Sequence, residues 1–530
     1  MLEIIGYTDC KMENNGGFMY YHVQSAVVIG IEGVPITIEV KLTNGLPSLH
    51  LVGLPDATVK EAKERVRSAL ESVGVRLPAK RITINLYPAE VRKRGAHLDL
   101  GMAAALLFAM GELPSQEGSM GFLGQLSLNG DILPVDGILP LVANFKDQGI
   151  DHVFVHPDNV EEAILVPGVR VIPCEDLATL ISLLQNDLMS LPTQQTLLGD
   201  TASTGAIQDS LQPDQTFSCF SEVLGQEAAK RAALIAAAGW HNLLMVGSPG
   251  SGKTMIAERL PTILPPMTYD ERLELTKIHS IAGLAKGKSL LQMRPFRNPH
   301  HSITPVSLAG GGAPPRPGEM SLANGGILFL DELPEYRKNA LESLREPLES
   351  HEVRHTRIGR SVRYPADFIF VAAMNPCRCG WSGDRERQCR CSPFDVKRYR
   401  GKVSGPILDR FDLLVEMPRV NFRSKLEGGL RSVDMAGRVK RAVEVQLKRQ
   451  GCLNGRLRPG QLEEVVRLEA QAQTFLHEAI TQLKLSARAR GRILRVARTI
   501  GDLQGSDGVE VDHIAEAIQF RLLEKRMQER

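Results

Sequence analysis

The segment LLMVGSPGSGKTMIAERL (residues 243–260) constrains this chain more than any other. Its apolar beginning predicts a strand, a glycine-rich turn follows, and the remainder predicts a helix. Gly247 to Thr254 have the spacing G-x-x-x-x-G-K-T, in which backbone N–H groups and a helix N-terminus surround phosphate oxygens. We expect Lys253 to reach the β and γ phosphates and the Thr254 hydroxyl to ligate Mg²⁺. The predicted ATP-binding residues are Gly247, Ser248, Pro249, Gly250, Ser251, Gly252, Lys253 and Thr254.

Two further strand ends carry polar side chains. GGILFLDELPEY (325–336) predicts a buried strand that ends at Asp331 and Glu332. We expect Asp331 to help hold Mg²⁺ and Glu332 to act as the general base towards water. The strand FIFVAAMNP (368–376) ends at Asn375, which is placed to orient that water, since strand ends line the crevice of an open α/β sheet. Taken alone, the Asp-Glu pair is equally typical of a solvated turn, and the nearby phosphate loop favours a function for it. For Asn375 the alternative is a turn-forming asparagine before Pro376, and its strand-end position favours a function.

The 530 residues divide into several regions by composition. Strand and helix patterns alternate over 26–174 and again from 217 to 420, which predicts an α/β protein. Residues 186–215 are rich in Ser, Thr, Gln, Gly and Pro and read as a linker, and residues 421–530 are charged and helical in pattern. Residues 1–18 carry no pattern, so they are either a disordered extension or precede the true initiator, Met19.

Charge and hydropathy exclude several classes of protein. With 63 basic and 61 acidic residues, any surface for nucleic acid must be local. No apolar run approaches the roughly 18 residues that a membrane span needs. The first residues lack a basic and then apolar secretory signal, so a cytoplasmic protein without membrane partners is expected.

Four of the eight cysteines form two C-x-C pairs, Cys377 with Cys379 and Cys389 with Cys391. Two such pairs around a polar loop can bring four thiolates to one tetrahedral ion, which predicts a structural zinc site at 377–391. Disulfides and free thiols are the alternatives, and a large cytosolic chain disfavours disulfides.

Two segments are strongly basic. VRHTRIGRSVRY (353–364) contains no acid and predicts a hairpin whose candidate DNA contacts are Arg354, Arg357, Arg360 and Arg363. A solvated basic hairpin is the alternative. In KLSARARGRILRVAR (484–498) we expect a helix rather than a DNA contact. The loop 295–321 contains adjacent His300 and His301, and its Arg297 and Arg316 are equally open to a pore contact or none.

The order of the motifs GSPGSGKT, PFRNPHHS, GEMSLANGGILFLDELPEY, AAMNPCRCG, SGPILDRFDL and SARARGRILRVARTI resembles the magnesium-chelatase-like AAA+ ATPases. Within them the chain looks most like the competence-protein ComM (YifB) family. The resemblance implies a homo-hexameric ring with ATP between subunits. By motif match, Arg410 resembles the arginine finger, Arg488 resembles the sensor-2 arginine of the helical lid, and the basic hairpin matches one that faces the pore.

The same resemblance gives the domains their names. Residues 19–185 resemble the proteolytic domain of Lon, of the ribosomal-S5-like α+β fold, 216–420 the AAA+ core, and 421–530 the helical lid. The segment matching the Lon serine motif, Arg94 to His97, has no serine, and the lysine would fall near Leu141. Because acyl chemistry needs both groups, we expect no protease activity.

The expected function is an ATP-dependent DNA motor. We expect a hexameric helicase that promotes branch migration on single-stranded or branched DNA during natural transformation, with recombination proteins as possible partners. ATP, Mg²⁺ and a structural Zn²⁺ are the expected cofactors. A magnesium-chelatase-like ATPase that remodels proteins without moving DNA is the alternative.

Overall fold

The computed structural model describes residues 19–114, 119–186, 219–285, 289–312, 315–357, 360–384, 386–419 and 430–529. The side chains of Met19, Arg357, Arg360 and 524–529 are not described, and the expected extension 1–18 and most of the linker 186–215 lie outside these ranges. Two compact units are present, Met1–Ser210 with Thr276–Leu291, and Leu211–Leu275 with Gln292–Arg530.

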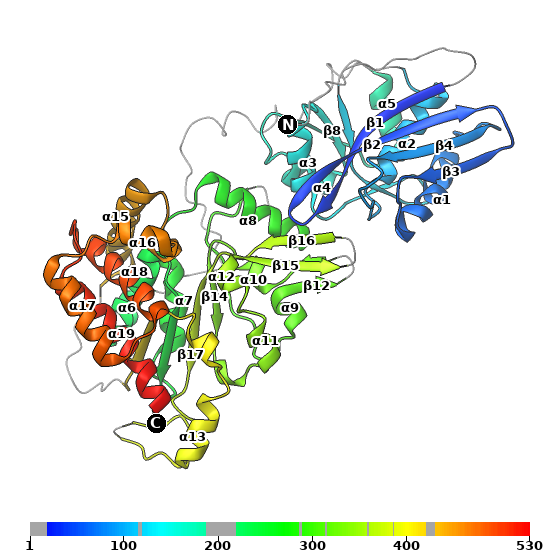
Figure 1. The fold of residues 1–530 in the computed structure, drawn as a ribbon. Coiled ribbons are helices and arrows are strands. Elements are labelled where there is room, and N and C mark those ends of the chain that lie inside the picture. The colour runs from blue at the N-terminus through cyan, green and yellow to red at the C-terminus, as the bar shows by residue number, and fades with distance from the viewer. Residues whose placement is uncertain are drawn as a thin grey trace. The chain divides into compact units, whose positions relative to one another are not determined.

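The N-terminal unit is built on a mixed seven-stranded sheet with helices packed on it (Figure 1). The strand order is β3-β4-β2-β1-β5-β8-β9, and the β1–β2 and β2–β4 pairs are antiparallel whereas the others are parallel. The strands are β1 (Met19–Ile29), β2 (Glu32–Thr43), β3 (Ser48–Val52), β4 (Arg81–Tyr87), β5 (Met120–Phe122), β8 (His152–Val155) and β9 (Arg170–Pro173), beside a small β6 (Gln125–Leu126) and β7 (Ile132–Leu133) pair. The helices are α1 (Ala57–Ser72), α2 (Asp99–Met110), α3 (Ile138–Asp147), α4 (Pro157–Ala163) and α5 (Leu177–Gln185).

Local sequence explains these elements. β1 and β2 form a hairpin around Gly30, whose φ of 68° suits a residue without a Cβ. The Asp56 carboxylate accepts a hydrogen bond from the Val59 N–H and caps α1. Helix α2 is buried on nearly every side, as its uninterrupted apolar sequence predicted.

A segment from the second half of the chain belongs to this first unit. Helix α8 (Tyr269–Ile281) begins in the second unit and continues into Thr276–Leu291 of the first. There the Lys277 Nζ lies 3.3 Å from Glu32 Oε2, and Gly283 approaches Asp136. The linker predicted at 186–215 did not indicate that a segment from beyond it belongs to the first unit.

The second unit contains a parallel five-stranded sheet. Its order is β11-β14-β17-β10-β18, which reads 5-1-4-3-2 from the β18 edge when the strands are numbered along the chain. The strands are β10 (Leu243–Gly247), β11 (Phe296–Arg297), β14 (Ile327–Leu330), β17 (Ile369–Met374) and β18 (Leu413–Met417). The helices around it are α6 (Glu227–Gly239), α7 (Lys253–Arg259), α9 (Pro305–Ala309), α10 (Glu319–Leu322), α11 (Lys338–Glu342), α12 (Pro347–Ser350), α13 (Pro393–Arg400) and α14 (Gly405–Leu408).

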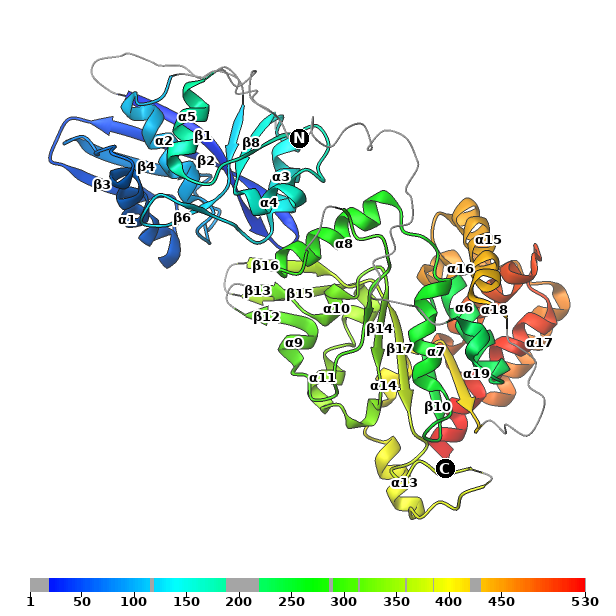
Figure 2. The same cartoon turned by 180° about the vertical axis from the view of Figure 1, so that it is seen from behind.

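Helices cover both faces of this sheet (Figure 2). Alternate residues of each strand enter two separate cores, as in β10, where Leu243 and Met245 face one core and Leu244 and Val246 the other. Burial on both faces explains why these strands are apolar throughout rather than alternating.

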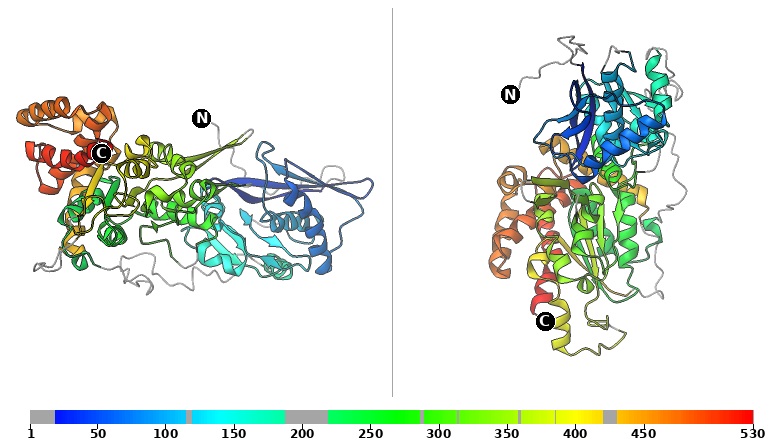
Figure 3. Two further views of the ribbon diagram at one scale, coloured as in Figure 1. Left: turned by 90° about the horizontal axis from the view of Figure 1, so that it is seen from below. Right: turned by 90° about the vertical axis from the view of Figure 1, so that its right-hand side faces the viewer.

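The C-terminal segment is helical, as its charged sequence predicted, and gathers on one side of the sheet (Figure 3). Its apolar side chains join the core that contains α6. The helices are α15 (Ser432–Gln450), α16 (Pro459–Val465), α17 (Ala470–Leu483), α18 (Ala487–Gln504) and α19 (Val511–Glu529). Among the described residues, no helix combines the length and the apolar character that crossing a bilayer requires.

Candidate active site

The phosphate loop joins the carboxyl end of β10 to the start of α7. Two of its residues must be glycine for reasons visible in the fold. Gly252 has a φ of 91°, and a Cβ on Gly247 would lie 2.4 Å from the Met417 carbonyl oxygen of β18. Close packing against β18 therefore requires glycine at position 247, and a left-handed turn requires glycine at position 252.

Lys253 is held by three acceptors. Its Nζ donates to the carbonyl oxygens of Gly247 at 2.8 Å and Ser248 at 3.0 Å, and to Asn375 Oδ1 at 3.2 Å. Burial lowers the pKa of this amine, and Asp331 and Glu332 oppose the shift. The structure thus brings together Lys253 and Asn375, which sequence reasoning assigned to one site from two separate strands.

The Asp-Glu pair lies beside them. Thr254 Oγ1 donates to Asp331 Oδ2 at 3.0 Å, so the two predicted Mg²⁺ ligands are in direct contact. A hydroxyl and a carboxylate are oxygen donors of the kind that Mg²⁺ prefers, so these residues fit the ion. Glu332 has a φ of 51°, and its side chain remains 56% exposed, which leaves the carboxylate open to a water molecule. We call Lys253, Thr254, Asp331, Glu332 and Asn375 the phosphate-loop cluster.

Two neighbours of this cluster were not assigned to it from the sequence. Gln226 Nε2 donates to the carbonyl oxygens of Ser251 at 2.9 Å and Pro418 at 2.7 Å, so it ties the phosphate loop to the residue after β18. His301 Nδ1 lies 4.0 Å from Glu332 Oε2. The adjacent histidines stand out in the sequence, although no role was predicted for them. A single glutamine such as Gln226 belongs to no recognisable pattern.

The four clustered cysteines lie directly behind the loop. Their ligand atoms lie within 4.8 Å of one another, and the Sγ atoms of Cys377, Cys379 and Cys389 are 3.4 to 3.6 Å apart. Those separations are too long for disulfides, which need about 2.05 Å, and are compatible with a tetrahedral Cys₄ zinc site that also includes Cys391. A Cβ on Gly380 would lie 2.5 Å from Pro249, so the cysteine loop packs against the phosphate loop.

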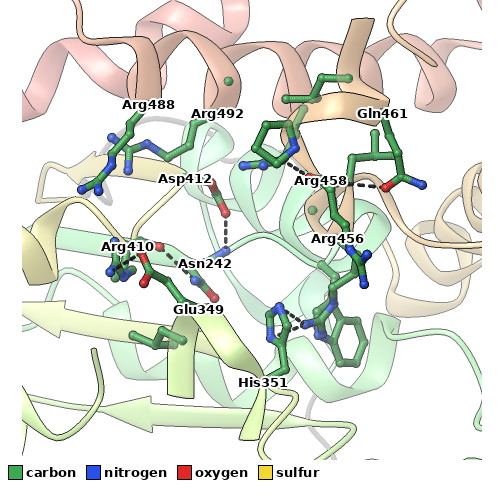
Figure 4. Close-up of a pocket in the computed structure, with 18 of the residues that line it drawn as sticks. Asn242, Glu349, His351, Arg410, Asp412, Arg456, Arg458, Gln461, Arg488 and Arg492 are labelled. Carbon is green, nitrogen blue, oxygen red and sulfur yellow. Dashed lines mark hydrogen bonds and ion pairs between the residues drawn. The ribbon is translucent and has the colours of Figure 1, made fainter. Parts of the chain in front are cut away.

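Arg410 and Arg488 lie together in a different place, a cavity of about 1150 Å³ shown in Figure 4. Seven arginines and four carboxylates line this cavity. Arg410 Nη2 is 2.6 Å from Glu349 Oε1, and Arg492 pairs with Asp409 at 3.1 Å. Burial lowers the pKa of Arg410, Glu349 opposes that shift, and the positive charge of Arg488 adds to it. We call Glu349, Arg410, Arg488, Arg456 and His351 the arginine cluster.

Strand β10 separates the two clusters. Asn242, just before this strand, donates from Nδ2 to the Arg410 carbonyl oxygen at 2.9 Å, whereas the phosphate loop follows the other end of the strand. Five residues at about 3.3 Å each separate the contact of Asn242 with the Arg410 backbone from the phosphate loop by roughly 16 Å. An arginine side chain is much shorter than that, so Arg410 does not reach the phosphate loop of its own chain.

The basic hairpin consists of β15 (Glu352–Arg357) and β16 (Arg360–Pro365). Its tip, residues 358 and 359, and the side chains of Arg357 and Arg360 lie outside the described residues. Arg354 and Arg363 are cross-strand partners and remain 46% and 64% exposed. Glu352 lies one residue before the acid-free segment and pairs with both of them, so the hairpin is less positive than residues 353–364 alone indicate.

The other basic candidates are engaged within the fold. Arg297 makes two bonds to Glu319, of 2.6 and 2.8 Å, so its guanidinium is committed to that carboxylate. In the 484–498 segment, Arg495 donates to the Leu457 carbonyl oxygen, and Arg498 is buried against Asp502.

In the N-terminal unit, the segment that matches the Lon serine motif lies just before α2. Lys93 is fully buried and donates to the Pro88 carbonyl oxygen, and burial lowers the pKa of His97 to about 4. Leu141, near which the Lon lysine would fall, is buried in α3. Arg94 to His97 contain no serine and Leu141 is an apolar core residue, so these positions offer neither the nucleophile nor the base of Lon.

A phosphate loop on strand 1 of a 5-1-4-3-2 parallel sheet, with a helical domain after it, is the architecture of an AAA+ ATPase. Comparison with known proteins agrees. The families described as "Magnesium chelatase, subunit ChlI", "Subunit ChlI of Mg-chelatase" and "Magnesium chelatase, subunit ChlI C-terminal" match residues 219–425, 38–159 and 429–521.

Individual relatives narrow the family. "Competence protein ComM" of Haemophilus influenzae is 38% identical over 511 residues, which is 96% of this chain and 98% of the relative. The "Uncharacterized protein YifB" of Escherichia coli is 39% identical over 508 residues, 95% of this chain and 97% of the relative. "Lon protease" of Mycolicibacterium smegmatis is 30% identical over 29% of this chain. The chain belongs to the ComM/YifB family of magnesium-chelatase-like AAA+ proteins, which confirms the resemblance, and this membership implies ATPase activity with ATP and Mg²⁺.

Proposed function

We propose that this protein is an ATP-driven DNA motor that works as a homo-hexameric ring, with a helicase activity that promotes branch migration. The observation that carries the proposal is the separation of Arg410 from the phosphate-loop cluster along strand β10. A site whose phosphate ligands and arginine lie at opposite ends of a strand is completed by a second copy of the chain, and closed rings are the usual result of such head-to-tail contacts.

In this proposal the phosphate-loop cluster binds and activates. Lys253 neutralises the β and γ phosphates, and Thr254 and Asp331 would hold Mg²⁺, which supplies positive charge to the phosphates when bound. Glu332 accepts the proton of the attacking water, and Asn375 orients that water. Zinc on the four cysteines would be structural, since four thiolates leave no open position for a substrate.

The arginine cluster supplies the remaining charge to the neighbour. Arg410 stabilises the negative charge that develops on the transferred phosphoryl group, and Arg488, which lines the same cavity, acts beside it. Together they make hydrolysis depend on contact between subunits, so that rings turn over ATP faster than single chains.

DNA is the proposed substrate for two reasons. Arg354 and Arg363 present exposed positive charge on one face of the hairpin, and a basic ridge can follow a phosphate backbone without reading bases. The name of the relative "Competence protein ComM" refers to competence, which agrees with recombination of incoming DNA and with recombination proteins as partners.

The test is the ATPase rate of the purified full chain with and without single-stranded and forked DNA, at two salt concentrations. We expect stimulation by DNA that weakens as salt rises, because phosphate contacts release counterions. The triple variant Arg354→Glu, Arg357→Glu, Arg360→Glu should bind DNA more weakly and show a flatter salt dependence.

A matched control is the triple variant Arg438→Glu, Lys440→Glu, Arg441→Glu, which reverses three exposed charges on α15. It should keep the affinity of the wild type. If folded, assembled protein hydrolyses ATP at a rate indifferent to DNA, the DNA motor is wrong, and the protein-remodelling ATPase of the chelatase type takes its place.

A further inference from the structure

Each end of the basic hairpin is connected to residues of the arginine cluster. Helix α12 carries Glu349 and is followed directly by His351 and strand β15. At the other end, β16 is followed by Asp367, whose carboxylate pairs with Arg456. The Arg456 Nη1 also lies 2.7 Å from His351 Nδ1, and Figure 4 shows His351 and Glu349 on the same wall of the cavity.

The contact that matters for hydrolysis is the one between Glu349 and Arg410. The 2.6 Å separation of Glu349 Oε1 from Arg410 Nη2 means that a carboxylate neutralises the guanidinium proposed to act on the neighbour's phosphate. The Arg410 side chain is 13% exposed and Glu349 is 60% exposed. An ion pair with so exposed a member is weak, so an incoming phosphate or a small shift of α12 can replace it.

The other charges around Arg410 make Glu349 the carboxylate that compensates its positive charge. Arg488 and, less strongly, Arg345 repel Arg410. The charge of Arg345 is itself paired with Glu342 at 2.9 Å, which leaves Arg488, among the described residues, as the main unpaired cation beside it. Asp409 attracts it, yet that carboxylate is already paired with Arg492. Removing the negative charge of Glu349 therefore leaves Arg410 among cations and strengthens its attraction for an external anion.

We propose that Glu349 is the positioning residue of Arg410 and couples the hairpin to hydrolysis. With the hairpin free, Glu349 holds the guanidinium away from the neighbouring subunit's ATP. When DNA engages the hairpin, α12 moves with β15, the pair separates, and Arg410 becomes available to the phosphate. This inference rests on the proposed roles of Arg410 and of the hairpin.

The experiment compares Glu349→Gln with Glu346→Gln in the full chain. Glu346 precedes α12, is exposed and loses the same charge on substitution. For Glu349→Gln we expect the DNA-free kcat to rise about two- to fivefold, the factor by which an exposed ion pair shifts an equilibrium. The KM for ATP should not change, and stimulation by single-stranded DNA should shrink by a similar factor. Glu346→Gln should match the wild type in all three.

Two results would overturn the proposal. One is a Glu349→Gln variant with the DNA-free rate and DNA stimulation of Glu346→Gln. The other is a DNA-free rate that falls as it does in Arg410→Ala, which would mean that Glu349 presents the arginine instead of restraining it. A wild type without DNA stimulation refutes the DNA motor, and in that case the DNA-free rates of the two glutamine variants still decide whether Glu349 restrains Arg410.

Discussion

The phosphate-loop cluster and the arginine cluster are built in opposite ways. In the first, Lys253 is buried and bonded to carbonyl and amide oxygens, and Thr254 is bonded to Asp331, so its members hold one another. In the second, Arg410 is paired with an exposed carboxylate at the end of a short helix. The first cluster is held in place by bonds among buried or half-buried groups, whereas the Arg410–Glu349 contact of the second is open to water on one side.

This difference has a physical basis in solvation. Removing any acceptor of a buried amine costs much free energy, because the unpaired group cannot bond to water instead. A half-exposed ion pair loses little, since water replaces either partner. Substitutions in the phosphate-loop cluster should therefore change nucleotide binding, and substitutions in the arginine cluster should change the timing of hydrolysis.

Replacement of Arg410 should separate the clusters most clearly. In Arg410→Ala we expect ATP to bind as in the wild type while kcat falls about 10³-fold, the lower end of the contribution of an arginine finger. Single-turnover hydrolysis and equilibrium nucleotide titration measure the two effects. Mixing Arg410→Ala with Glu332→Gln subunits should restore part of the activity. No restoration would mean that the arginine acts within its own chain or not at all.

Replacement of Lys253 should weaken nucleotide binding, which replacement of Arg410 leaves unchanged. Lys253→Ala removes the charge that contacts the phosphates, so we expect nucleotide affinity to fall about 100-fold, the loss typical of charged hydrogen bonds. Titration with a fluorescent ATP analogue measures it. Affinity equal to that of Arg410→Ala would contradict the assignment of binding to the phosphate-loop cluster alone.

Loss of the proposed zinc ion should act only on the phosphate-loop cluster. In Cys389→Ser we expect bound zinc to be lost and ATP affinity to fall about tenfold, because the loop that packs on Pro249 must then be ordered on binding. Metal analysis and the same titration report both effects. Cys452→Ser, outside the four-cysteine cluster, should keep zinc and affinity. A zinc-free variant that binds ATP normally would uncouple the cysteine loop from the site.

The smallest effect concerns His351 in the arginine cluster. Burial and Arg456 lower the pKa of His351 to about 4, below the usual value of 6.5. Between these values the unfolded chain takes up a proton and the folded chain does not, so this residue makes stability fall as pH drops from 6.5 towards 4. Because the side chain is 44% exposed, the difference should stay below about 1 kcal/mol.

Urea unfolding of wild type and His351→Gln at pH 7.5 and pH 5 measures this effect. The variant should lose less stability on acidification than the wild type. His50→Gln, an exposed position on β3, is the control and should behave as the wild type. An equal loss in His351→Gln and wild type would show that His351 is as well solvated when folded as when unfolded.

The sequence predicted the first cluster better than the second, for a physical reason. The phosphate loop is one contiguous segment, and Asp331 and Asn375 follow strands whose carboxyl ends meet at one edge of a parallel sheet. Arg410 and Arg488 meet because the helical domain packs on one face of that sheet, and no local pattern encodes that contact. Their roles came from resemblance to a family, not from spacing.

Partners that act through tertiary contact were missed. Glu349 and Gln226 are single polar residues without a motif, and their significance comes from the atoms opposite them. The hairpin strands were predicted, yet Glu352 lay one residue outside the run that was counted. Composition placed a linker between the domains, whereas the contribution of Thr276–Leu291 to the first unit depends on packing alone.

That contribution bears on how the protein is made. The N-terminal unit contains Thr276–Leu291, with the fully buried Ile278 among its residues. A ribosome delivers the chain from its N-terminus, so this unit cannot be completed until the phosphate loop and helix α8 of the second half have been synthesised. A shortened protein that starts after the linker would keep every ATP-binding motif and yet leave this segment without the surface on which it folds. The two halves are thus separate in their chemistry but interleaved during biosynthesis.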